Sequence, residues 1–344
     1  MGNMIVIRGP RELGYADTED LALKPGEVRL EMLYSGISAG TQLTLYRGNN
    51  PYLTKSFNAD LRVFEPADQT KSPYPIPGAW AYEEVGRICE LGPGVTQVSE
   101  GMVVYGTWGH RTHQVVSEEY CLSHLLPEEL DPVLGIYSQM GAIAMNAILD
   151  ADIHVGETVA VFGQGVPGQI VSQLARLNGA DVIAVDRNDY RLNMAKRLGA
   201  FKTINSDSCD AGLEIKRMTK GGADKVIEIS GSPKALHSAI RSCSYNGKVV
   251  CSGFMTLEAS GLILGEEFHH NRIQLICSQI ENTGPHVRDV WNRIRMEKTI
   301  YRLCRENRLD LLSLITHRFA YREAEKAYTM LDSSMECLQT VLQF

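Results

Sequence analysis

The sequence contains no uninterrupted apolar run of about 18 residues, the length that usually marks a membrane-spanning helix. Its first residues lack the charged stretch and apolar core of a secretion signal, and position 6 is Val rather than the Ser or Thr that myristoylation requires. It has no internal repeat and no low-complexity linker. We therefore expect a cytoplasmic protein without a membrane partner.

The sequence also lacks a surplus of basic residues and a regular spacing of cysteines. Its 344 residues carry a formal net charge of −7, and Lys and Arg are scattered, whereas a nucleic-acid partner needs a basic face. None of the eight cysteines forms a C-x-x-C pair, so neither a zinc knuckle nor a disulfide framework is indicated. We expect reduced thiols without a chemical role, no nucleic-acid partner and a small, neutral substrate.

The pattern of the chain changes character twice. Residues 1–131 hold short strand patterns broken by Gly and Pro, residues 132–305 hold strands that alternate with helices, and residues 306–344 hold a strand followed by a helix. With 44% hydrophobic residues, the chain can bury two cores. The alternation predicts an α/β fold with a doubly wound, parallel, six-stranded sheet. Its expected strands are residues 158–162, 181–186, 203–205, 225–229, 248–253 and 273–278.

The most informative motif is a glycine-rich loop at residues 163–168, Gly-Gln-Gly-Val-Pro-Gly, between the first of these strands and a helix. In a G-x-G-x-x-G loop at such a place, the first glycine permits a tight turn and the second lets the backbone approach a pyrophosphate. The third lets the helix pack closely on the strand, and the helix N-terminus faces the negative charge. The loop therefore predicts a bound dinucleotide.

An acidic residue about 20 positions further on specifies which dinucleotide binds. Asp186, at the end of the second strand, is expected to accept hydrogen bonds from both ribose hydroxyls and to repel a 2′-phosphate, which favours NAD over NADP. Arg187 and Arg191 leave some tolerance of NADP open. The predicted cofactor site comprises Gly163, Gln164, Gly165, Val166, Pro167, Asp186, Arg187, Arg191, Ser230 and Gly253.

Three further motifs accompany the loop: Gly36-Ile37-Ser38-Ala39-Gly40-Thr41-Gln42, Tyr82-Glu83-Glu84-Val85-Gly86 and Ile315-Thr316-His317-Arg318-Phe319. In this order, the four motifs resemble the medium-chain dehydrogenase/reductase superfamily, which includes the zinc-type alcohol dehydrogenases. The resemblance implies a GroES-like catalytic domain at residues 1–131, a Rossmann NAD-binding domain at 132–305 and a C-terminal return to the catalytic domain at 306–344. It also implies that the nicotinamide lies in the cleft between the domains, and that the protein is a homo-oligomer, a dimer or tetramer, paired through residues 273–278.

The metal-binding residues of that superfamily are replaced in this chain. Zinc-type members hold the catalytic metal with a Cys in the first motif and a His in the second. This chain has Ser38 near the first position and Tyr82 at the second, and only Glu83 of the expected group remains. Hydroxyl groups are poor zinc ligands, and the four-cysteine lobe of many relatives is missing. We predict that no metal is bound. The conceivable replacement ligands are His110, His113, His269 and His270.

Without a metal, oxidation of an alcohol needs a protein group that takes the hydroxyl proton while hydride leaves. The resemblance places Thr41, Tyr82 and Glu83 at the reacting hydroxyl. We expect Tyr82, or a relay through Thr41, to contact this hydroxyl, with Glu83 as proton acceptor or orienting group. The alternative is structural: Tyr82 packs in a wall, and Glu83 pairs with an arginine such as Arg87 or Arg111.

A histidine completes the predicted catalytic set. His110 ends the turn at residues 106–110, Gly-Thr-Trp-Gly-His, which follows an apolar strand, and loops carry function more often than strands do. With Trp108 beside it, His110 could hold a sugar ring by stacking and hydrogen bonding. The alternative is an ordinary surface turn.

Three longer runs narrow the substrate class. Residues 41–48, 57–64 and 264–271 resemble bacterial medium-chain sugar dehydrogenases that oxidise the 3-hydroxyl of hexosides and that also lack the usual zinc ligands. We therefore predict an NAD-dependent enzyme that oxidises a secondary hydroxyl, at C3, of a sugar or glycoside to a ketone. Residues 47–75 are interpreted as a polar insertion over the cleft, or simply a solvated loop. Its plausible sugar contacts are Asn58, Asp60, Arg62 and Asp68.

Two other functions remain open on the same fold. One is a zinc-free reductase of activated double bonds or quinones, for which an NADPH preference and an uncharged turn after the second strand are expected; Asp186 weighs against it. The other is a non-enzymatic NAD(H) binder, such as a redox sensor, that kept the loop and lost the metal site. Cofactor binding without NADH production from hexosides would favour the latter.

Overall fold

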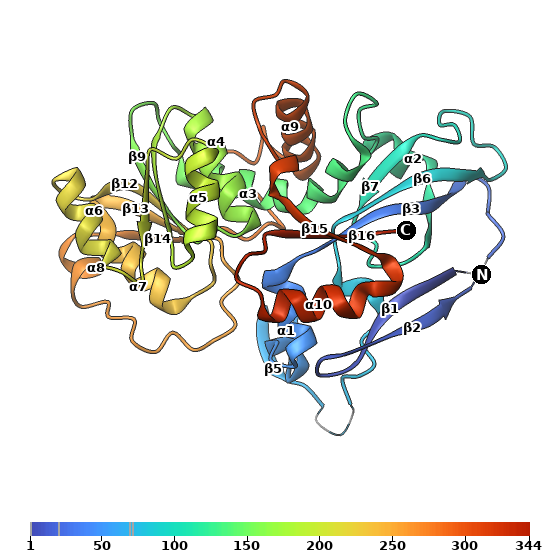
Figure 1. Ribbon diagram of the computed structural model, residues 1–344, viewed down its shortest axis with the longest axis horizontal. Coiled ribbons are helices and arrows are strands. Elements are labelled where there is room, and N and C mark those ends of the chain that lie inside the picture. Colours follow the sequence, from blue (N-terminus) through green and yellow to red (C-terminus); the bar gives the residue numbers. More distant parts are fainter. Residues whose placement is uncertain (1, 20, 69, 71) are drawn as a thin grey trace. The chain divides into compact units, whose positions relative to one another are not determined.

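The computed structural model describes residues 2–19, 21–68, 70 and 72–344. The chain splits into two compact units, which can be followed by colour in Figure 1. Unit 1 is Met1–Tyr137 with Ile315–Phe344, and unit 2 is Ser138–Leu314. Both boundaries lie later in the chain than the expected ones after residues 131 and 305.

Local packing explains these boundaries. Residues Pro132–Tyr137 form a 3₁₀ helix (η3) that packs on three strands of unit 1. Near the second boundary, Asp310 exchanges two hydrogen bonds with Gln173 of unit 2: its N–H donates to Oε1 at 2.9 Å, and its carbonyl accepts from Nε2 at 3.0 Å. The residues after the last long helix of unit 2 are therefore tied to that unit.

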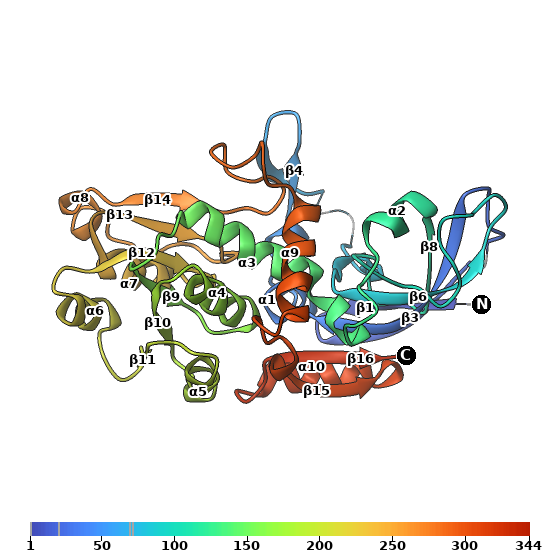
Figure 2. The ribbon, with the colours of Figure 1, turned by 90° about the horizontal axis from the view of Figure 1, so that it is seen from above.

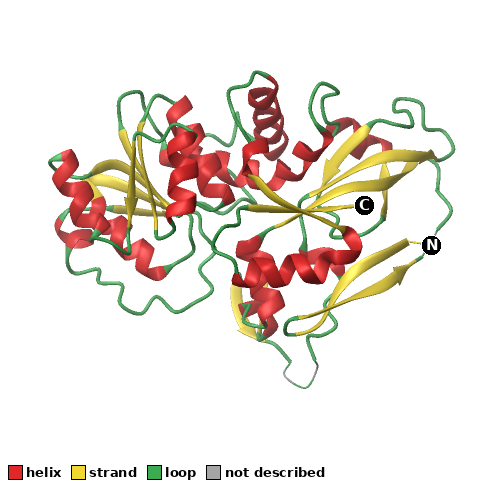
Figure 3. Ribbon diagram, viewed as in Figure 1, coloured by secondary structure: helices red, strands yellow, loops and turns green. Residues whose placement is uncertain are grey.

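Unit 1 is built on a mixed six-stranded sheet (Figure 3). Apolar residues alternate along its longest strand, in which Val28, Leu30 and Met32 are all buried. The strands are β3 (Glu27–Ile37), β6 (Glu84–Leu91), β7 (Val103–Gly106), β8 (His113–Ser117), β15 (Ile315–Ala320) and β16 (Gln339–Gln343). They follow the order β15-β16-β3-β6-β7, with β8 also paired to β3. Only β15 and β16 run parallel, and β16 brings the C-terminal segment beside β3.

Shorter elements complete unit 1. Two antiparallel pairs lie outside the main sheet: β1 (Gly2–Gly9) with β2 (Glu12–Thr18), and β4 (Lys55–Asn58) with β5 (Val63–Pro66). The helices are α1 (Ala39–Arg47), α2 (Glu118–Ser123) and α10 (Ala324–Ser333), with 3₁₀ helices η1 (Pro51–Leu53), η2 (Gly78–Trp80) and η5 (Tyr321–Glu323). Helices α1 and α10 pack together over a core that includes Ile37, Tyr46 and Tyr328.

Unit 2 is a six-stranded, fully parallel sheet, which confirms the predicted fold class. Its strands are β9 (Thr158–Phe162), β10 (Asp181–Asp186), β11 (Lys202–Asn205), β12 (Ala223–Glu228), β13 (Cys243–Cys251) and β14 (Gln274–Cys277). The strand order is β11-β10-β9-β12-β13-β14, so the chain adds strands on one side of β9 up to β11 and then reverses to the other side from β12 onward. In open α/β sheets, ligands bind beyond the carboxyl ends of the strands at such a reversal, and this is where the glycine-rich loop begins.

Helices surround this sheet (Figure 2). They are α3 (Ser138–Ala151), α4 (Val166–Leu177), α5 (Asp189–Arg197), α6 (Ala211–Thr219), α7 (Pro233–Ser242), α8 (Glu267–His270), α9 (Arg293–Arg305) and the 3₁₀ helix η4 (Leu312–Leu314). Helix α3 packs on α4 and α9, while α7 packs on α6 and α8. The stretch Pro132–Ala151 is long and apolar enough to cross a membrane, but 78% of its most apolar window is buried, as is usual for a core helix.

Candidate functional site

The glycine-rich loop of unit 2 has the backbone that its sequence predicts. Gly163 adopts a φ of +97°, and a side chain there would lie 2.8 Å from the Cβ atom of Ser230. A Cβ atom on Gly168 would overlap the carbonyl oxygen of Gly163, because α4 packs closely on the end of β9. Gly165 is different: it has ordinary backbone angles and no atom nearer than 3.9 Å to a built Cβ. Space is therefore left at the glycine expected to face a ligand.

The first turn of α4 begins directly after this open glycine. Gly165 is the N-cap residue and offers no side chain to the first amides, so they stay available to an anion. Val166 and Pro167 are the first two helical residues, and Pro167 has no N–H to leave unsatisfied. Gln164 is buried and locks the loop from inside: its Nε2 donates to the Val161 carbonyl at 3.0 Å.

Asp186 ends β10 beside the loop, with 8% of its surface exposed. Its Oδ2 accepts the N–H of Gln164 at 2.6 Å, and its Oδ1 accepts the N–H of Asn188 at 2.9 Å. These bonds fix the carboxylate at the strand end predicted to hold a ribose. Arg187 is exposed and forms an ion pair with Asp207 at 3.3 Å.

A pocket of about 590 Å³ opens here and collects five residues of the predicted cofactor set. These five are Gly163, Asp186, Arg187, Arg191 and Ser230. The guanidinium group of Arg191 lies over Gly165: its Nη1 is 3.9 Å from the position that a Cβ atom on Gly165 would take. Its Nε is buried without a hydrogen-bond partner among the described residues. A guanidinium group above an open glycine fits a phosphate group.

Gly253 was predicted for the cofactor site and does not line this pocket, whereas His237 lines it without having been predicted. Gly253 follows β13 and packs against the backbone of Gly231, so it shapes the next loop and does not line the pocket. On α7, His237 faces the pocket with a buried Nδ1 that has no partner among the described residues. The available signal in the sequence was the place of His237 in the helix that begins after the N-cap residue Ser232. Taken together, the loop, Asp186 and Arg191 fit a dinucleotide.

In unit 1, the structure brings three hydroxyl groups together, which we name the hydroxyl triad: Ser38, Thr41 and Tyr82. The Tyr82 hydroxyl lies 2.6 Å from the Ser38 Oγ and 2.9 Å from the Thr41 Oγ1. Ser38 is the N-cap residue of α1 but forms no side-chain cap. Burial, followed by the charge of Glu83, raises the pKa of Tyr82 to about 12. Tyr82 is therefore a neutral phenol that can both donate and accept.

Glu83, next to the triad, is fully buried. Its Oε2 accepts the amide N–H of Gln339 on β16 at 2.9 Å, so its partner among the described residues is not Arg87 or Arg111. Its Oε1 has no partner among these residues. A side chain on Gly36 would overlap Oε2, so the position of the carboxyl group depends on that glycine. Burial, followed by the nearby Glu84, raises the pKa of Glu83 to about 8.

His110 and Trp108 are both buried, so they do not form the ordinary surface turn given as the alternative, and contact of His110 with a sugar ring stays a prediction. The Nδ1 atom lies 2.5 Å from the Ser35 Oγ, and Nε2 lies 2.9 Å from the Gln42 Oε1. The Tyr328 hydroxyl is 3.1 Å from the same Nε2. Burial lowers the pKa of His110 to about 3, so the ring is neutral. No bond joins it to the hydroxyl triad in the described part of the chain.

Glu84 is a buried carboxyl group that the sequence analysis did not single out. Its Oε2 accepts the N–H of Trp108 at 2.7 Å and of Gly109 at 3.0 Å, and its Oε1 lies 3.1 Å from the Ser35 hydroxyl. Burial raises its pKa to about 7, even though these bonds act in the opposite direction. The available signal was its place beside Glu83 in the Tyr82-Glu83-Glu84-Val85-Gly86 motif.

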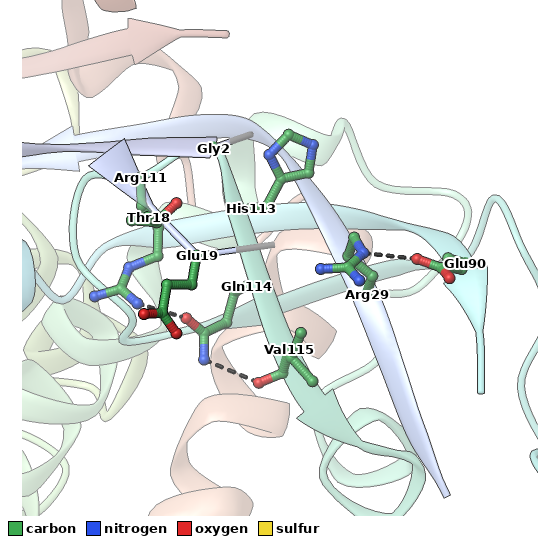
Figure 4. Close-up of a pocket in the computed structure, with 9 residues that line it drawn as sticks. All are labelled: Gly2, Thr18, Glu19, Arg29, Glu90, Arg111, His113, Gln114 and Val115. Carbon is green, nitrogen blue, oxygen red and sulfur yellow. Dashed lines mark hydrogen bonds and ion pairs between the residues drawn. The ribbon is translucent and has the colours of Figure 1, made fainter. Parts of the chain in front are cut away.

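The donor set does not suit zinc, which takes Cys, His or carboxylate ligands. Over residues 2–19, 21–68, 70 and 72–344, no group of three or more such side chains could hold a metal ion. His269 and His270 are exposed on α8, and His113 lines a separate pocket of about 350 Å³ (Figure 4). In that pocket, Arg29 is paired with Glu90. Its mixed charges indicate no particular ligand.

The predicted sugar contacts of the insertion stabilise its own turns. Asn58 closes the β4–β5 hairpin, since its Oδ1 accepts the N–H groups of Asp60 and Leu61. Arg62 adopts a φ of +55° within this turn. Asp68 accepts the backbone and hydroxyl hydrogens of Thr70. These bonds shape the loop, so a sugar-binding role for its polar residues stays a prediction.

The chain is similar in sequence to known dehydrogenases. A family described as zinc-binding dehydrogenase matches residues 167–294. The chain is 31% identical over 335 residues to D-guloside 3-dehydrogenase of Escherichia coli (strain K12), covering 94% of each protein. It is 28% identical to (R,R)-butanediol dehydrogenase of Bacillus subtilis (strain 168), covering 67% of this chain and 71% of that protein.

A solved structure gives the same fold. The crystal structure of galactitol-1-phosphate dehydrogenase from Escherichia coli superposes with a TM-score of 0.79 at 18% identity, covering 99% of this chain and 100% of that one. At that identity, the likeness supports the architecture alone. The parallel sheet of unit 2 and the mixed sheet of unit 1 are thus found together in a solved dehydrogenase structure.

Proposed function

This chain belongs to the zinc-binding dehydrogenase family of medium-chain, alcohol dehydrogenase-like oxidoreductases, and from that premise we propose that it is an NAD-dependent sugar dehydrogenase without a catalytic zinc. Its proposed reaction is oxidation of the 3-hydroxyl of a hexoside to a ketone. The observation that carries the proposal is the hydroxyl triad, which stands where zinc-type members have metal ligands. The similarity to a D-guloside 3-dehydrogenase supports the substrate class.

The residues that would hold the dinucleotide lie in unit 2. The first amides of α4, beside Gly165, and the guanidinium group of Arg191 would bind the pyrophosphate. Asp186 would accept the ribose hydroxyls, and its negative charge disfavours a 2′-phosphate, which supports NAD over NADP. When bound, the nicotinamide supplies the acceptor for the hydride.

The residues that manage the proton lie in unit 1. The reacting hydroxyl would bond to the Tyr82 and Thr41 hydroxyls, which orient it by donating and accepting. The pKa of Tyr82, about 12, keeps the phenol protonated near neutral pH, so it has no free site for the substrate proton and cannot be the final base. Glu83 has a pKa of about 8, close to working pH, and an oxygen without a partner among the described residues. We therefore assign Glu83 as the final proton acceptor, since general bases work best when their pKa matches the pH.

The absence of zinc from the proposal follows from the donor chemistry. Serine, threonine and tyrosine hydroxyls bind zinc poorly, and the one carboxyl group beside them is bonded to Gln339. The oxyanion that develops during hydride loss would instead be stabilised by hydrogen bonds from the triad.

The decisive experiment incubates the purified protein with NAD and a panel of methyl hexosides and follows NADH by its near-ultraviolet absorbance. NMR of the product identifies the oxidised carbon, and emission spectroscopy measures bound metal in the same sample. We expect NADH formation, a 3-keto product and activity that survives prolonged chelation. Loss of activity on chelation, with recovery on adding zinc, would contradict the metal-free mechanism.

The same panel separates the alternative functions. Consumption of NADPH with quinones or activated alkenes, and none with hexosides, would identify a reductase. Tight dinucleotide binding with no turnover in either assay would identify a binding protein. Neither is favoured by a specific contact in the described structure.

A further inference from the structure

A chain of buried polar side chains runs through unit 1 beside the hydroxyl triad, and we name it the polar chain. Its members come from strands, a loop and two helices that lie far apart in the sequence. Burying a polar group without a partner costs free energy, so such side chains are tolerated where they satisfy one another. The five members are Ser35, Gln42, Glu84, His110 and Tyr328, all of them buried.

Glu84 anchors one end of the polar chain. Through Oε2 it holds the N–H groups of Trp108 and Gly109, and thus the loop that presents His110. Through Oε1 it lies within hydrogen-bond distance of the Ser35 hydroxyl on β3. A single carboxyl group therefore joins the start of β6, the neighbouring strand and the loop.

The proton positions in the middle of the polar chain follow from its donors and acceptors. The Gln42 Oε1 can only accept, so neutral His110 carries its ring proton on Nε2, 2.9 Å away. The Nδ1 atom must then accept from the Ser35 hydroxyl at 2.5 Å. Because that hydroxyl has a single proton, its 3.1 Å contact with the Glu84 Oε1 is a hydrogen bond only when Glu84 is protonated and donates to Ser35. The Tyr328 hydroxyl donates to the same Gln42 oxygen at 2.5 Å. Gln42 is thereby held from two sides.

Gln42 connects the polar chain to the hydroxyl triad. It lies in the first turn of α1, where its N–H donates to the Ser38 carbonyl at 2.8 Å. Thr41 is the preceding residue of the same turn. The Ser38 and Thr41 hydroxyls hold Tyr82, so a shift of Gln42 would displace the groups that orient the tyrosine.

We propose that Glu84, Ser35 and His110 are positioning residues, which act through Gln42 to hold the first turn of α1 and thereby the Tyr82 hydroxyl in its reacting geometry. This inference rests on the proposed function, because it assigns Tyr82 to the reaction. None of the three residues contacts the substrate. His110 is thus assigned a supporting role in place of the direct one expected from its sequence context.

A double-mutant cycle tests the proposal. Ser35→Ala removes one buried hydroxyl and should lower kcat about tenfold, with KM for NAD unchanged, because unit 2 is untouched. In a Tyr82→Phe background, the same substitution should change kcat less than about twofold, since the group that it positions is gone. Independent, multiplying effects of the two substitutions would overturn the proposal.

Tyr328→Phe provides a second route to the same result, in case Ser35→Ala folds poorly. It also removes one hydroxyl from the polar chain and should show the same dependence on Tyr82. The matched control is Tyr46→Phe, a buried tyrosine of α1 outside the polar chain that packs 5.2 Å from the Tyr328 ring. Equal effects of the two tyrosine substitutions would show that packing, and not the polar chain, is responsible.

A substrate-free measurement separates failure of this inference from failure of the proposed function. NMR of the protein labelled at the tyrosine ζ carbons reports the environment of the Tyr82 hydroxyl, with Tyr82→Phe giving the assignment. Ser35→Ala should shift the Tyr82 signal, whereas Tyr46→Phe should not. An unchanged Tyr82 signal overturns the positioning role, whatever the substrate proves to be. If the Tyr82 signal shifts but the protein oxidises no hexoside, the proposed function is refuted, whereas the link between the polar chain and Tyr82 is supported.

Discussion

At the residue scale, the position of Tyr82 was predictable, whereas the surroundings of His110 were not. Tyr82 and Thr41 occupy places in two short motifs, and the structure brings their hydroxyls within 2.9 Å. His110 owes its burial to Ser35, Gln42 and Tyr328, which come from segments far apart in the sequence. No local pattern records such long-range packing. A glycine-rich turn therefore looked like a surface loop.

The first residue-scale prediction concerns the phenol oxygen of Tyr82. Tyr82→Phe should lower kcat about 100-fold, because it removes the group that orients and stabilises the reacting oxygen. Affinity for NAD, measured by fluorescence titration, should stay near that of the original protein. Tyr46→Phe, which changes another buried tyrosine, should leave kcat nearly unchanged. A Tyr82→Phe enzyme of full activity would remove Tyr82 from the mechanism.

The second prediction concerns the pH dependence of turnover. As a proton acceptor, Glu83 works in its ionised form, and its pKa is about 8. The kcat for hexoside oxidation should therefore rise with pH and level off above about 8. Glu83→Gln should lower kcat and abolish this rise. If the variant shows the same pH profile, another group accepts the proton.

The same raised pKa has a consequence for stability. Between the ordinary value of 4.5 and about 8, the folded protein holds a proton on Glu83 that the unfolded chain has lost. The free energy of unfolding contributed by this group therefore falls as pH rises through that range. Glu83→Gln removes the loss, so denaturant titrations should show its stability relative to the original protein improving from pH 4.5 to 8. The control is Glu90→Gln, which alters an exposed carboxylate on β6; a similar improvement there would contradict the assignment.

At the element scale, periodicity predicted the six strands of unit 2, and the glycine-rich loop indicated where its dinucleotide is proposed to bind. Strand β13 begins earlier than expected, at Cys243, because the chain continues through Asn246 at a φ of +58°. A polar residue with that backbone angle interrupts the apolar pattern on which the sequence prediction depends. The end of β13 has the larger consequence for the predicted cofactor site, because the strand stops at Cys251 and Gly253 therefore lies in the following loop.

Two glycines of the glycine-rich loop at residues 163–168 give a matched pair of variants. Gly168→Ala would overlap the Gly163 carbonyl oxygen and should destabilise the protein by about 1–3 kcal/mol, as overpacking does. Gly165→Ala meets nothing closer than 3.9 Å, so thermal unfolding should barely change. Its methyl group would instead obstruct the approach of a pyrophosphate and should weaken NADH binding at least about tenfold. Unaltered NADH affinity in Gly165→Ala would place the dinucleotide elsewhere.

At the scale of the whole molecule, each unit has its own core and supplies one part of the proposed chemistry. The cores are separate clusters, such as Phe162 and Val185 in unit 2 and Tyr46 and Tyr328 in unit 1. Composition could indicate two cores, but it could not show that the last strand returns to pair with β3. That pairing brings Gln339 to Glu83, so the position of the proposed proton acceptor depends on a residue 256 positions further along the chain.

The edge of the parallel sheet is expected to join copies of this protein. Strand β14 pairs only with β13 among the described residues, and Leu275 on this edge is 39% exposed. An unpaired, apolar edge strand favours association, commonly about a two-fold axis. Light scattering during gel filtration should show a dimer or tetramer, and Leu275→Arg should shift it to a smaller species. Leu213→Arg is the matched control, because Leu213 is similarly exposed, at 40%, but belongs to helix α6 and not to the edge strand. Dissociation by both substitutions would point to general destabilisation, and a monomeric original protein would exclude the β14 interface.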